Sequence, residues 1–264
     1  MTVRQRLVAG LLVVLLVGCG TGGSSSGEVV PTAPVDSDGV GVDSGFRPRP
    51  NGFSFPNRIP AEPFDYADAV AMFGPDAVCR EPDGGCTPRP EATAWVEKVS
   101  AASWGGLCEG MALMSTDRWV DREQPDTAGL PDTTALAHRL MQWWATQFLE
   151  TVMSAGNERT NDPAEVLARL EEAIRIDGPG ATLTLDHRGM SHTLVPYTVQ
   201  RDGDSALIGV YDPNSPGEER AVSLDLAANE WTYDFPSDNT DKLPWTGTAF
   251  DIGVVSLEAR ATPW

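Results

Sequence analysis

The chain is poor in basic residues. It has 19 Lys and Arg against 38 Asp and Glu among 264 residues, which gives a formal net charge of −19. Because affinity for phosphate backbones comes largely from clustered cations, this composition argues against a nucleic-acid partner. Apolar residues make up 41% and charged residues 22% of the sequence, which disfavours wholesale disorder, a collagen-like fibre and a polytopic membrane protein. We expect one globular domain with a tail.

Cysteine is also scarce, because four cysteines are too few for a disulfide scaffold of this length. Cys79 and Cys86 bracket the turn-rich segment Arg-Glu-Pro-Asp-Gly-Gly, which predicts a local disulfide in an oxidising compartment. A metal site at this pair would need further ligands nearby, and the sequence has none there. We therefore expect no metal and no other cofactor.

Long apolar runs are missing except at the N-terminus. Two cations precede the run Leu7–Val17, which is too short to span a bilayer and is typical of a secretory signal. The run ends in Leu-Val-Gly-Cys19, which resembles the lipobox of bacterial lipoproteins, in which the cysteine receives diacylglycerol. The resemblance implies a signal peptide over residues 1–18, lipid attachment at Cys19 and an extracytoplasmic location on a bacterial membrane. The alternative is an ordinary signal with a chance cysteine.

Residues 19–51 are rich in Gly, Ser and Pro and have almost no aromatic side chain before Phe46. Such a segment buries too little apolar surface to offset chain entropy. We predict a disordered tether that reaches about 30 Å from the membrane. The folded domain is then expected over residues 52–264.

Hydrophobic periodicity separates a helical part from a strand part. Helical spacing starts at Leu107 and recurs over residues 131–155 and 163–176. Alternating spacing then predicts strands at 181–186, 193–199, 206–211, 220–225, 230–234 and 250–258. Because helices come first and a sheet second, the predicted fold class is α+β.

Cys108 is left over once the other three cysteines have been assigned. It follows Gly105-Gly106 and falls in the first turn of the helix that starts at Leu107. Backbone N–H groups and the helix dipole stabilise a thiolate at such a position and lower its pKa, as a sulfur nucleophile requires. The alternative is a small buried side chain at a helix start.

A predicted hairpin places a histidine near a carboxylate. Its turn is centred between Asp202 and Gly203, so His192 falls opposite position 213 and beside Asp212. Asp212 would orient the ring of His192, which would exchange a proton with Cys108. His138 lies inside the helical region of residues 131–155, where we expect a structural or surface role.

The three motifs together resemble papain-like cysteine peptidases of the bacteriocin-processing-like branch. They read Gly-Gly-Leu-Cys108-Glu-Gly-Met, then Ser-His192-Thr-Leu-Val-Pro-Tyr, then Val-Tyr-Asp212-Pro-Asn. The resemblance implies a helical half carrying Cys108 as nucleophile and an antiparallel β half carrying His192 as general base and acid and Asp212 as orienting residue.

The resemblance fails at one position. The family usually places a glutamine that donates to the oxyanion about six residues before the cysteine, and here that position is Ala102. Ser103 and Trp104 are the side chains nearby that could supply a donor instead, beside the backbone N–H of Cys108.

Three functions remain open from the sequence. The first is a lipid-anchored thiol hydrolase or acyl transferase acting on peptide or isopeptide bonds outside the cell. The second is a catalytically silent papain-like module that binds peptides or cell-envelope partners. The third is a calcium-stabilised structural lipoprotein, suggested by the acidic segments 212–219 and 234–241. A zinc site formed by Cys108, His192 and Asp212 lacks a short ligand pair to anchor it.

Overall fold

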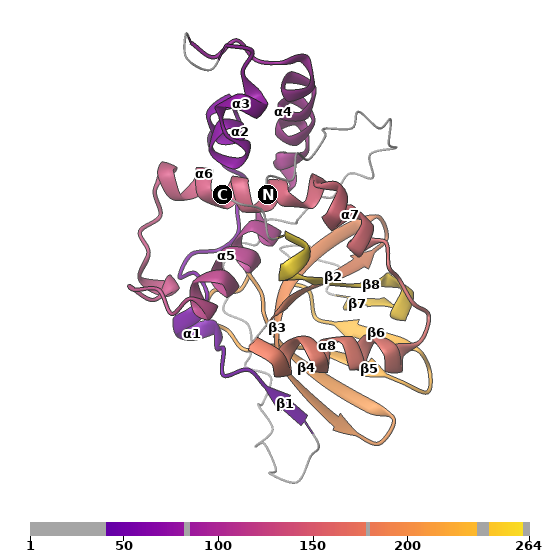
Figure 1. The fold of residues 1–264 in the computed structure, drawn as a ribbon. Helices are drawn as coiled ribbons and strands as arrows, with labels where there is room; N and C mark the ends of the chain where they lie inside the picture. The colour runs from indigo at the N-terminus through magenta and orange to yellow at the C-terminus, as the bar shows by residue number, and fades with distance from the viewer. Residues whose placement is uncertain (1–40, 82–84, 178–179, 237–242, 261–264) are drawn as a thin grey trace.

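The computed structural model describes residues 41–81, 85–177, 180–236 and 243–260. These residues form a group of helices and an antiparallel sheet, so the α+β prediction is confirmed (Figure 1). The predicted signal peptide, Cys19 and most of the predicted tether lie outside the described residues.

The helical part contains most of the N-terminal half of the described chain. Its helices are α1 (Pro48–Asn51), α2 (Tyr66–Phe73), α3 (Pro75–Val78), α4 (Pro90–Ala102), α5 (Cys108–Val120), α6 (Thr134–Ala145) and α7 (Glu150–Gly156). The apolar faces of α2 to α6 share one core, in which Val99, Met111, Met141 and Trp144 are almost fully buried. Helix α7 instead packs Val152 in a smaller cluster with Val255. Gly110 lets α5 approach α6 closely, because a Cβ at this position would lie 2.1 Å from the Leu140 carbonyl oxygen.

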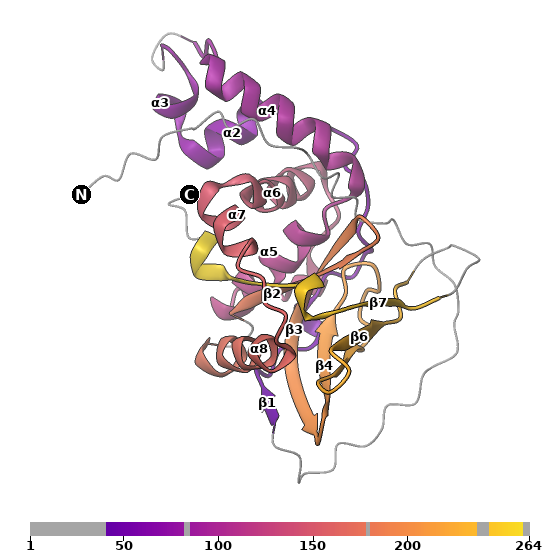
Figure 2. The same cartoon turned by 90° about the vertical axis from the view of Figure 1, so that its right-hand side faces the viewer.

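The sheet follows in the sequence, and a helix packs on one of its faces. Its strands are β1 (Gly41–Asp43), β2 (Ala181–His187), β3 (Met190–Asp202), β4 (Ser205–Tyr211), β5 (Arg220–Asp225), β6 (Glu230–Tyr233), β7 (Trp245–Gly247) and β8 (Ile252–Ser256). They run in the order β7-β6-β5-β4-β3-β2-β8, and β1 pairs with β3. Helix α8 (Pro163–Asp177) lies beside the sheet (Figures 1 and 2) and buries Leu167 and Leu170 in the sheet core.

Helix α5 contacts the opposite face of β3. Side chains alternate along a strand, so Leu194 enters the sheet core while Val195 packs with Ala112 of α5. A register shift between Pro196 and Thr198 then restores the inward direction for Val199, which also lies in the sheet core. Proline fits this irregular position because it has no N–H to donate to a neighbouring strand.

The predicted hairpin is present with a shifted turn. Asp202 pairs with Ser205, so the turn consists of Gly203 and Asp204 and the register at the turn is two residues from the predicted one. Beyond the irregularity at Pro196 the difference is one residue, since Val195 pairs with Tyr211. The prediction that His192 and Asp212 lie at the same end of these strands therefore holds.

Other predicted elements match in type and differ in extent. Residues 131–155 form two helices separated by a 3-10 turn at Thr146–Phe148. The last predicted strand is shorter than expected, because β8 covers only Ile252–Ser256. The predicted disulfide between Cys79 and Cys86 is present, with the two Cα atoms 4.9 Å apart.

The predicted start of the folded domain at residue 52 is wrong. Residues 41–43 add strand β1 to β3, and the Phe46 ring is fully buried against Trp119, Tyr197 and Tyr211. One large buried aromatic side chain and three paired strand residues hold this polar segment against the sheet. The folded part therefore includes residues 41–51.

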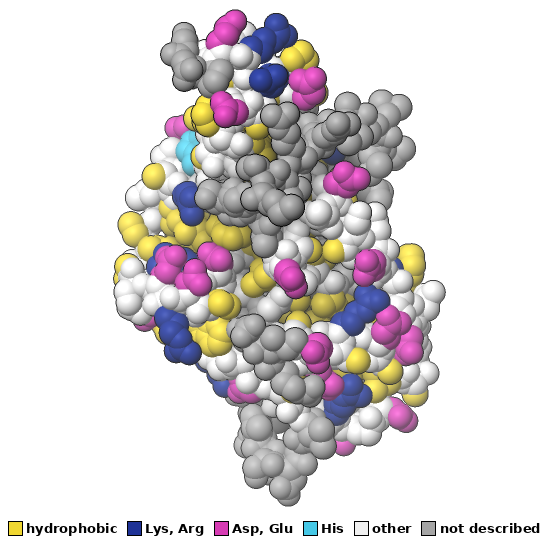
Figure 3. All heavy atoms as spheres, viewed as in Figure 1, with side chains coloured by type: hydrophobic (Ala, Val, Ile, Leu, Met, Phe, Trp, Pro, Cys, Tyr) yellow, Lys and Arg dark blue, Asp and Glu magenta, His cyan; other side chains and the backbone are white. Residues whose placement is uncertain are grey.

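The surface offers no strong clustering of basic charge on the face seen in Figure 3. Acidic and basic side chains are interspersed there, with apolar side chains between them. None of the helices in the described residues has both the length and the apolar character that crossing a bilayer requires.

We expect Phe46→Ala to lower the free energy of unfolding by about 3–5 kcal/mol, because it leaves a cavity under β3 and β4. Urea denaturation followed by tryptophan fluorescence measures the change. Asp43→Ala is the matched control in the same segment, since it removes only exposed contacts, the ion pair with Arg47 and the hydrogen bond from the Gly45 N–H, and should cost less than about 1 kcal/mol. Equal midpoints for Phe46→Ala and the unmutated chain would contradict the assignment of residues 41–51 to the folded part.

Candidate active site

His192 and Asp212 are in direct contact inside the molecule. Nε2 of His192 lies 2.7 Å from Oδ1 of Asp212, and both side chains have no exposed surface. His192 comes from the first part of β3, and Asp212 directly follows the end of β4. The antiparallel pairing of the two strands thus joins residues that are 20 positions apart in sequence.

Two further groups donate hydrogen bonds to the Asp212 carboxylate, and a third donates to one of these two groups. The Tyr233 hydroxyl donates to Oδ2, and the backbone N–H of Asn214 donates to Oδ1 over 2.7 Å. Nε of Arg220 donates in turn to the Tyr233 hydroxyl over 3.2 Å. Each oxygen of the buried carboxylate therefore has at least one donor, as a charge without access to water requires.

These contacts keep Asp212 ionised. Burial acts to raise the pKa of Asp212, but the neighbouring His192 and the hydrogen bonds from His192, Tyr233 and the Asn214 amide together hold it below its usual value. Burial and the negative charge of Asp212 also raise the pKa of Tyr233 well above its usual value, so its hydroxyl remains a donor. Asp212 is therefore a buried carboxylate held by three donors, namely the His192 ring, the Tyr233 hydroxyl and the Asn214 amide.

The same contacts decide which ring nitrogen of His192 carries the hydrogen. An ionised carboxylate accepts only, so Nε2 is the protonated nitrogen and Nδ1 of a neutral ring is an acceptor. Nδ1 is buried and has no hydrogen-bond partner among the described residues. The rings of Phe235 and Trp245 pack nearly perpendicular to the His192 ring, with centroids at 5.0 and 6.5 Å from its centroid. These rings keep water from the His192–Asp212 contact and leave Nδ1 as the basic atom of the site.

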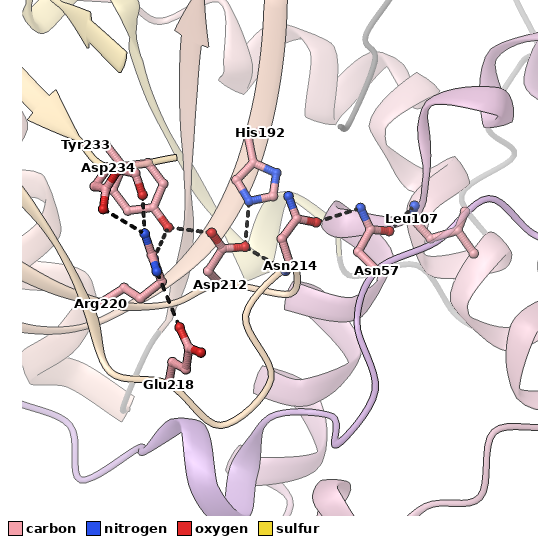
Figure 4. A network of polar contacts seen from close by, with 9 residues as sticks. All are labelled: Asn57, Leu107, His192, Asp212, Asn214, Glu218, Arg220, Tyr233 and Asp234. Atoms are coloured by element: carbon pink, nitrogen blue, oxygen red, sulfur yellow. Dashed lines mark hydrogen bonds and ion pairs between the residues drawn. The ribbon is translucent and has the colours of Figure 1, made fainter. Parts of the chain in front are cut away.

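A chain of hydrogen bonds links this pair to the start of helix α5 (Figure 4). Nδ2 of Asn57 donates to Oδ1 of Asn214 over 3.1 Å, and Oδ1 of Asn57 accepts the backbone N–H of Leu107 over 2.6 Å. Leu107 immediately precedes Cys108, the first residue of α5. The histidine and carboxylate of the β part and the first turn of α5 therefore belong to one polar network.

Cys108 lies in the first turn of α5 as predicted, but the expectation that it carries a free thiol is wrong. It is almost fully buried and disulfide-bonded, and no cysteine among the described residues is free. The next residue, Glu109, forms a buried ion pair with Arg260, with Nη2 and Oε1 2.5 Å apart. This ion pair fixes the first turn of α5 to the end of the described chain.

The two oxyanion candidates named from the sequence gain no support. The hydroxyl of Ser103 donates to the carbonyl oxygen of Ser100 over 2.9 Å, so its hydrogen is already used within the end of α4. The side chain of Trp104 lies outside the described part.

His138 has the structural role expected from its place in a helix. Nδ1 contacts the buried carboxylate of Asp68 at 2.9 Å, and Nε2 lies 3.3 Å from Glu62. Burial acts to lower the pKa of His138, but the hydrogen bond and charge of Asp68, with help from Glu62, outweigh it and raise the pKa. The contact ties α6 to α2, away from the His192–Asp212 pair.

The acidic segments that suggested calcium use their oxygens in other ways. The side chain of Asp212 binds His192 and Tyr233, and that of Asn214 binds Asn57. Residues 237–242 of the second segment are outside the described ranges. A different acidic group, Asp117, Asp121 and Glu123, comes together at the end of α5.

Sequence reasoning missed several members of the network. Asn57 and Tyr233 lie far from the three motifs, and Arg220 follows the third motif without belonging to it. Single polar residues in loops and strands carry no periodic signal. Tyr233 was placed correctly in a strand, and alternation along that strand was the one available indication that it faces inward.

We expect Tyr233→Phe to lower the free energy of unfolding by about 1–3 kcal/mol, because it leaves one oxygen of the buried Asp212 carboxylate without its donor. Urea denaturation provides the measurement. Tyr66→Phe is the control, since the Tyr66 hydroxyl is exposed and its change should stay within about 0.5 kcal/mol. Equal stability of the two variants would contradict the importance of the Tyr233 hydrogen bond.

Comparison with known proteins assigns no family. The chain matches no family model, no curated protein and no solved structure. Its function therefore has to be argued from the chemistry that this site can perform.

Proposed function

We propose that this protein is a thiol hydrolase or acyl transferase with a papain-like arrangement, in which Cys108, His192 and Asp212 act on peptide or isopeptide bonds. The observation that carries the proposal is the buried His192–Asp212 pair, which hydrogen bonds link to the first turn of α5. Nδ1 of His192 has no hydrogen-bond partner among the described residues and can accept a proton. The helical part would carry the nucleophile and the sheet the base, as in papain-like peptidases.

The reaction would use each residue in one role. Nδ1 of His192 takes the proton of the Cys108 thiol, and the thiolate attacks the carbonyl carbon of the substrate. When the C–N bond breaks, the protonated ring returns its proton to the leaving amine, and a thioester on Cys108 remains. Water then completes hydrolysis, or a second amine completes acyl transfer. Asp212 holds Nε2 and stabilises the imidazolium that forms.

This chemistry requires the disulfide of Cys108 to be reduced first. A dithiol reductant can supply the two electrons: one of its thiolates attacks the disulfide, its second thiol closes a new disulfide, and Cys108 is released as a thiol. The proposal therefore describes an enzyme that is latent in the state seen here.

We also propose that the protein is anchored to a bacterial membrane on its extracytoplasmic side. The support is the lipobox-like sequence that ends at Cys19, together with the predicted signal run before it. The lipid would occupy the Cys19 sulfur in a thioether, so a lipidated Cys19 takes no part in a disulfide. With Cys79 and Cys86 paired, the lipidated chain and the chain with a disulfide at Cys108 would be alternative states of the protein. The substrate would then be a peptide or protein outside the cytoplasm.

One observation favours the second candidate, a catalytically silent module that binds peptides or envelope partners. His192 is fully buried and Cys108 is almost fully buried, so a substrate carbonyl has no open path to them in this state. The two functions differ in whether reduction makes Cys108 reactive.

We expect iodoacetamide to alkylate Cys108 in the full chain after treatment with a dithiol and to leave it unmodified before that treatment. The thiolate at the start of α5 should react faster than an ordinary thiol, and His192→Ala should slow the reaction. Peptide mapping by mass spectrometry identifies the modified cysteine, and a mixture of tryptic peptides with the same readout reveals cleavage or transfer. Cys108→Ala should abolish turnover.

The double variant Cys79→Ser/Cys86→Ser is the matched control, because it removes the other described disulfide and should retain the reactivity of Cys108. A reduced chain in which Cys108 resists alkylation under native conditions would exclude the enzyme and favour the silent module.

We expect metabolic labelling with a fatty acid to modify the unmutated chain and not Cys19→Ala, which should also leave the membrane fraction. Arg4→Gln serves as the control within the signal, because it keeps the cysteine. Incorporation of label into Cys19→Ala would contradict lipid attachment at this residue.

A further inference from the structure

The side chain of Asn214 has a buried donor that no described residue accepts. Asn214 is 7% exposed, and its Nδ2 has no hydrogen-bond partner within the described residues. The nearby Nδ1 of His192 is in the same situation. Two such atoms at one buried site point to a ligand that supplies their partners, because protein interiors rarely leave polar groups unsatisfied.

The orientation of the Asn214 amide is fixed by its neighbours. Oδ1 of Asn57 accepts the Leu107 N–H, so the other end of that amide is the nitrogen, which must donate. Its acceptor on Asn214 is therefore Oδ1. If the oxygen and nitrogen of the Asn214 amide were exchanged, two NH₂ groups would face each other and neither could accept. Nδ2 of Asn214 consequently points away from Asn57.

Nδ2 of Asn214 points toward the side of the site on which His192 lies. In Figure 4 the Asn214 amide lies between Asn57 and His192, with its oxygen toward Asn57 and its nitrogen on the His192 side. Its backbone N–H is bound to the same oxygen of Asp212 that holds His192. Backbone and side chain of Asn214 are thus both held, so Nδ2 is a rigid donor.

We propose that Nδ2 of Asn214 donates to the carbonyl oxygen of the substrate and stabilises the oxyanion that forms when Cys108 attacks. This inference rests on the proposed function and assigns a catalytic role to Asn214 and a positioning role to Asn57. A preorganised donor of this kind is worth more in a site without water than in solution, because it pays no reorganisation cost as charge develops. The substrate class is a peptide-like carbonyl, whose oxygen accepts this hydrogen bond.

Two reactions of the Cys108 thiolate distinguish stabilisation of an oxyanion by Asn214 from a purely structural role of Asn214. With 4-nitrophenyl acetate, the Cys108 sulfur bonds to the carbonyl carbon, the carbonyl electrons move to oxygen, and 4-nitrophenolate leaves as they return. With iodoacetamide, the sulfur displaces iodide directly and no oxyanion forms. Only the first reaction uses the proposed donor.

In the reduced full chain, we expect Asn214→Ala to slow acylation by 4-nitrophenyl acetate on the order of 100-fold or more, as loss of an oxyanion donor does elsewhere. Alkylation by iodoacetamide should keep the pH dependence of the unmutated chain. Asn157→Ala is the matched control, since Asn157 is exposed at the end of α7 and should react as the unmutated chain in both assays.

The possible results distinguish a failure of the Asn214 role from a failure of the proposed function. If Asn214→Ala does not fold, Asn214→Ser is the second variant, since it is polar, lacks the amide nitrogen and should show the same selective loss. Unchanged acylation in these variants, or an equal loss in acylation and alkylation, would overturn the role of Asn214. An unmutated chain that reacts with neither reagent at Cys108 would instead overturn the proposed function.

Discussion

The carboxylate of Asp212 is a charge enclosed by the fold, and the surrounding structure is organised to supply it with donors. Removing a carboxylate from water costs several kcal/mol, which only well-placed partners offset. His192 comes from β3, Tyr233 from β6 and the Asn214 amide from the turn after β4, so three segments must be in register before the charge is stabilised. The register of the sheet and the ionisation of Asp212 therefore depend on each other.

The same constraint joins the two parts of the molecule. Side-chain amides of Asn57 and Asn214 carry the network from Asp212 to the first turn of α5, and the buried ion pair of Glu109 and Arg260 holds that turn from another side. Both links are polar and buried, so a small displacement of α5 would leave groups unsatisfied. Such links fix direction as well as distance, whereas the apolar contacts between α5 and β3 are non-directional.

The sequence was sufficient for features that follow from local periodicity. The start of α5 at Cys108, the proline-capped α8 and the hairpin of β3 and β4 follow from spacing and turn residues, and the hairpin alone brings His192 to Asp212. Features that depend on tertiary contacts were missed. Residues 41–51 read as a tether because their composition is polar, yet the Phe46 ring binds them to the core. Asn57 reaches the site from a loop that has no motif of its own.

The state of Cys108 shows why counting cysteines was not enough. The spacing of Cys79 and Cys86 correctly predicts their disulfide, but a free thiol at Cys108 does not follow by elimination, because pairing is decided by which sulfurs meet in space. A disulfide at this position is compatible with the proposed function, because a helix start that stabilised the Cys108 thiolate would also make Cys108 a good leaving group in disulfide exchange. The helix start that would activate Cys108 toward a carbonyl would thus also favour its release by a dithiol. Reduction and catalysis would then depend on one electrostatic feature, the N-terminus of α5.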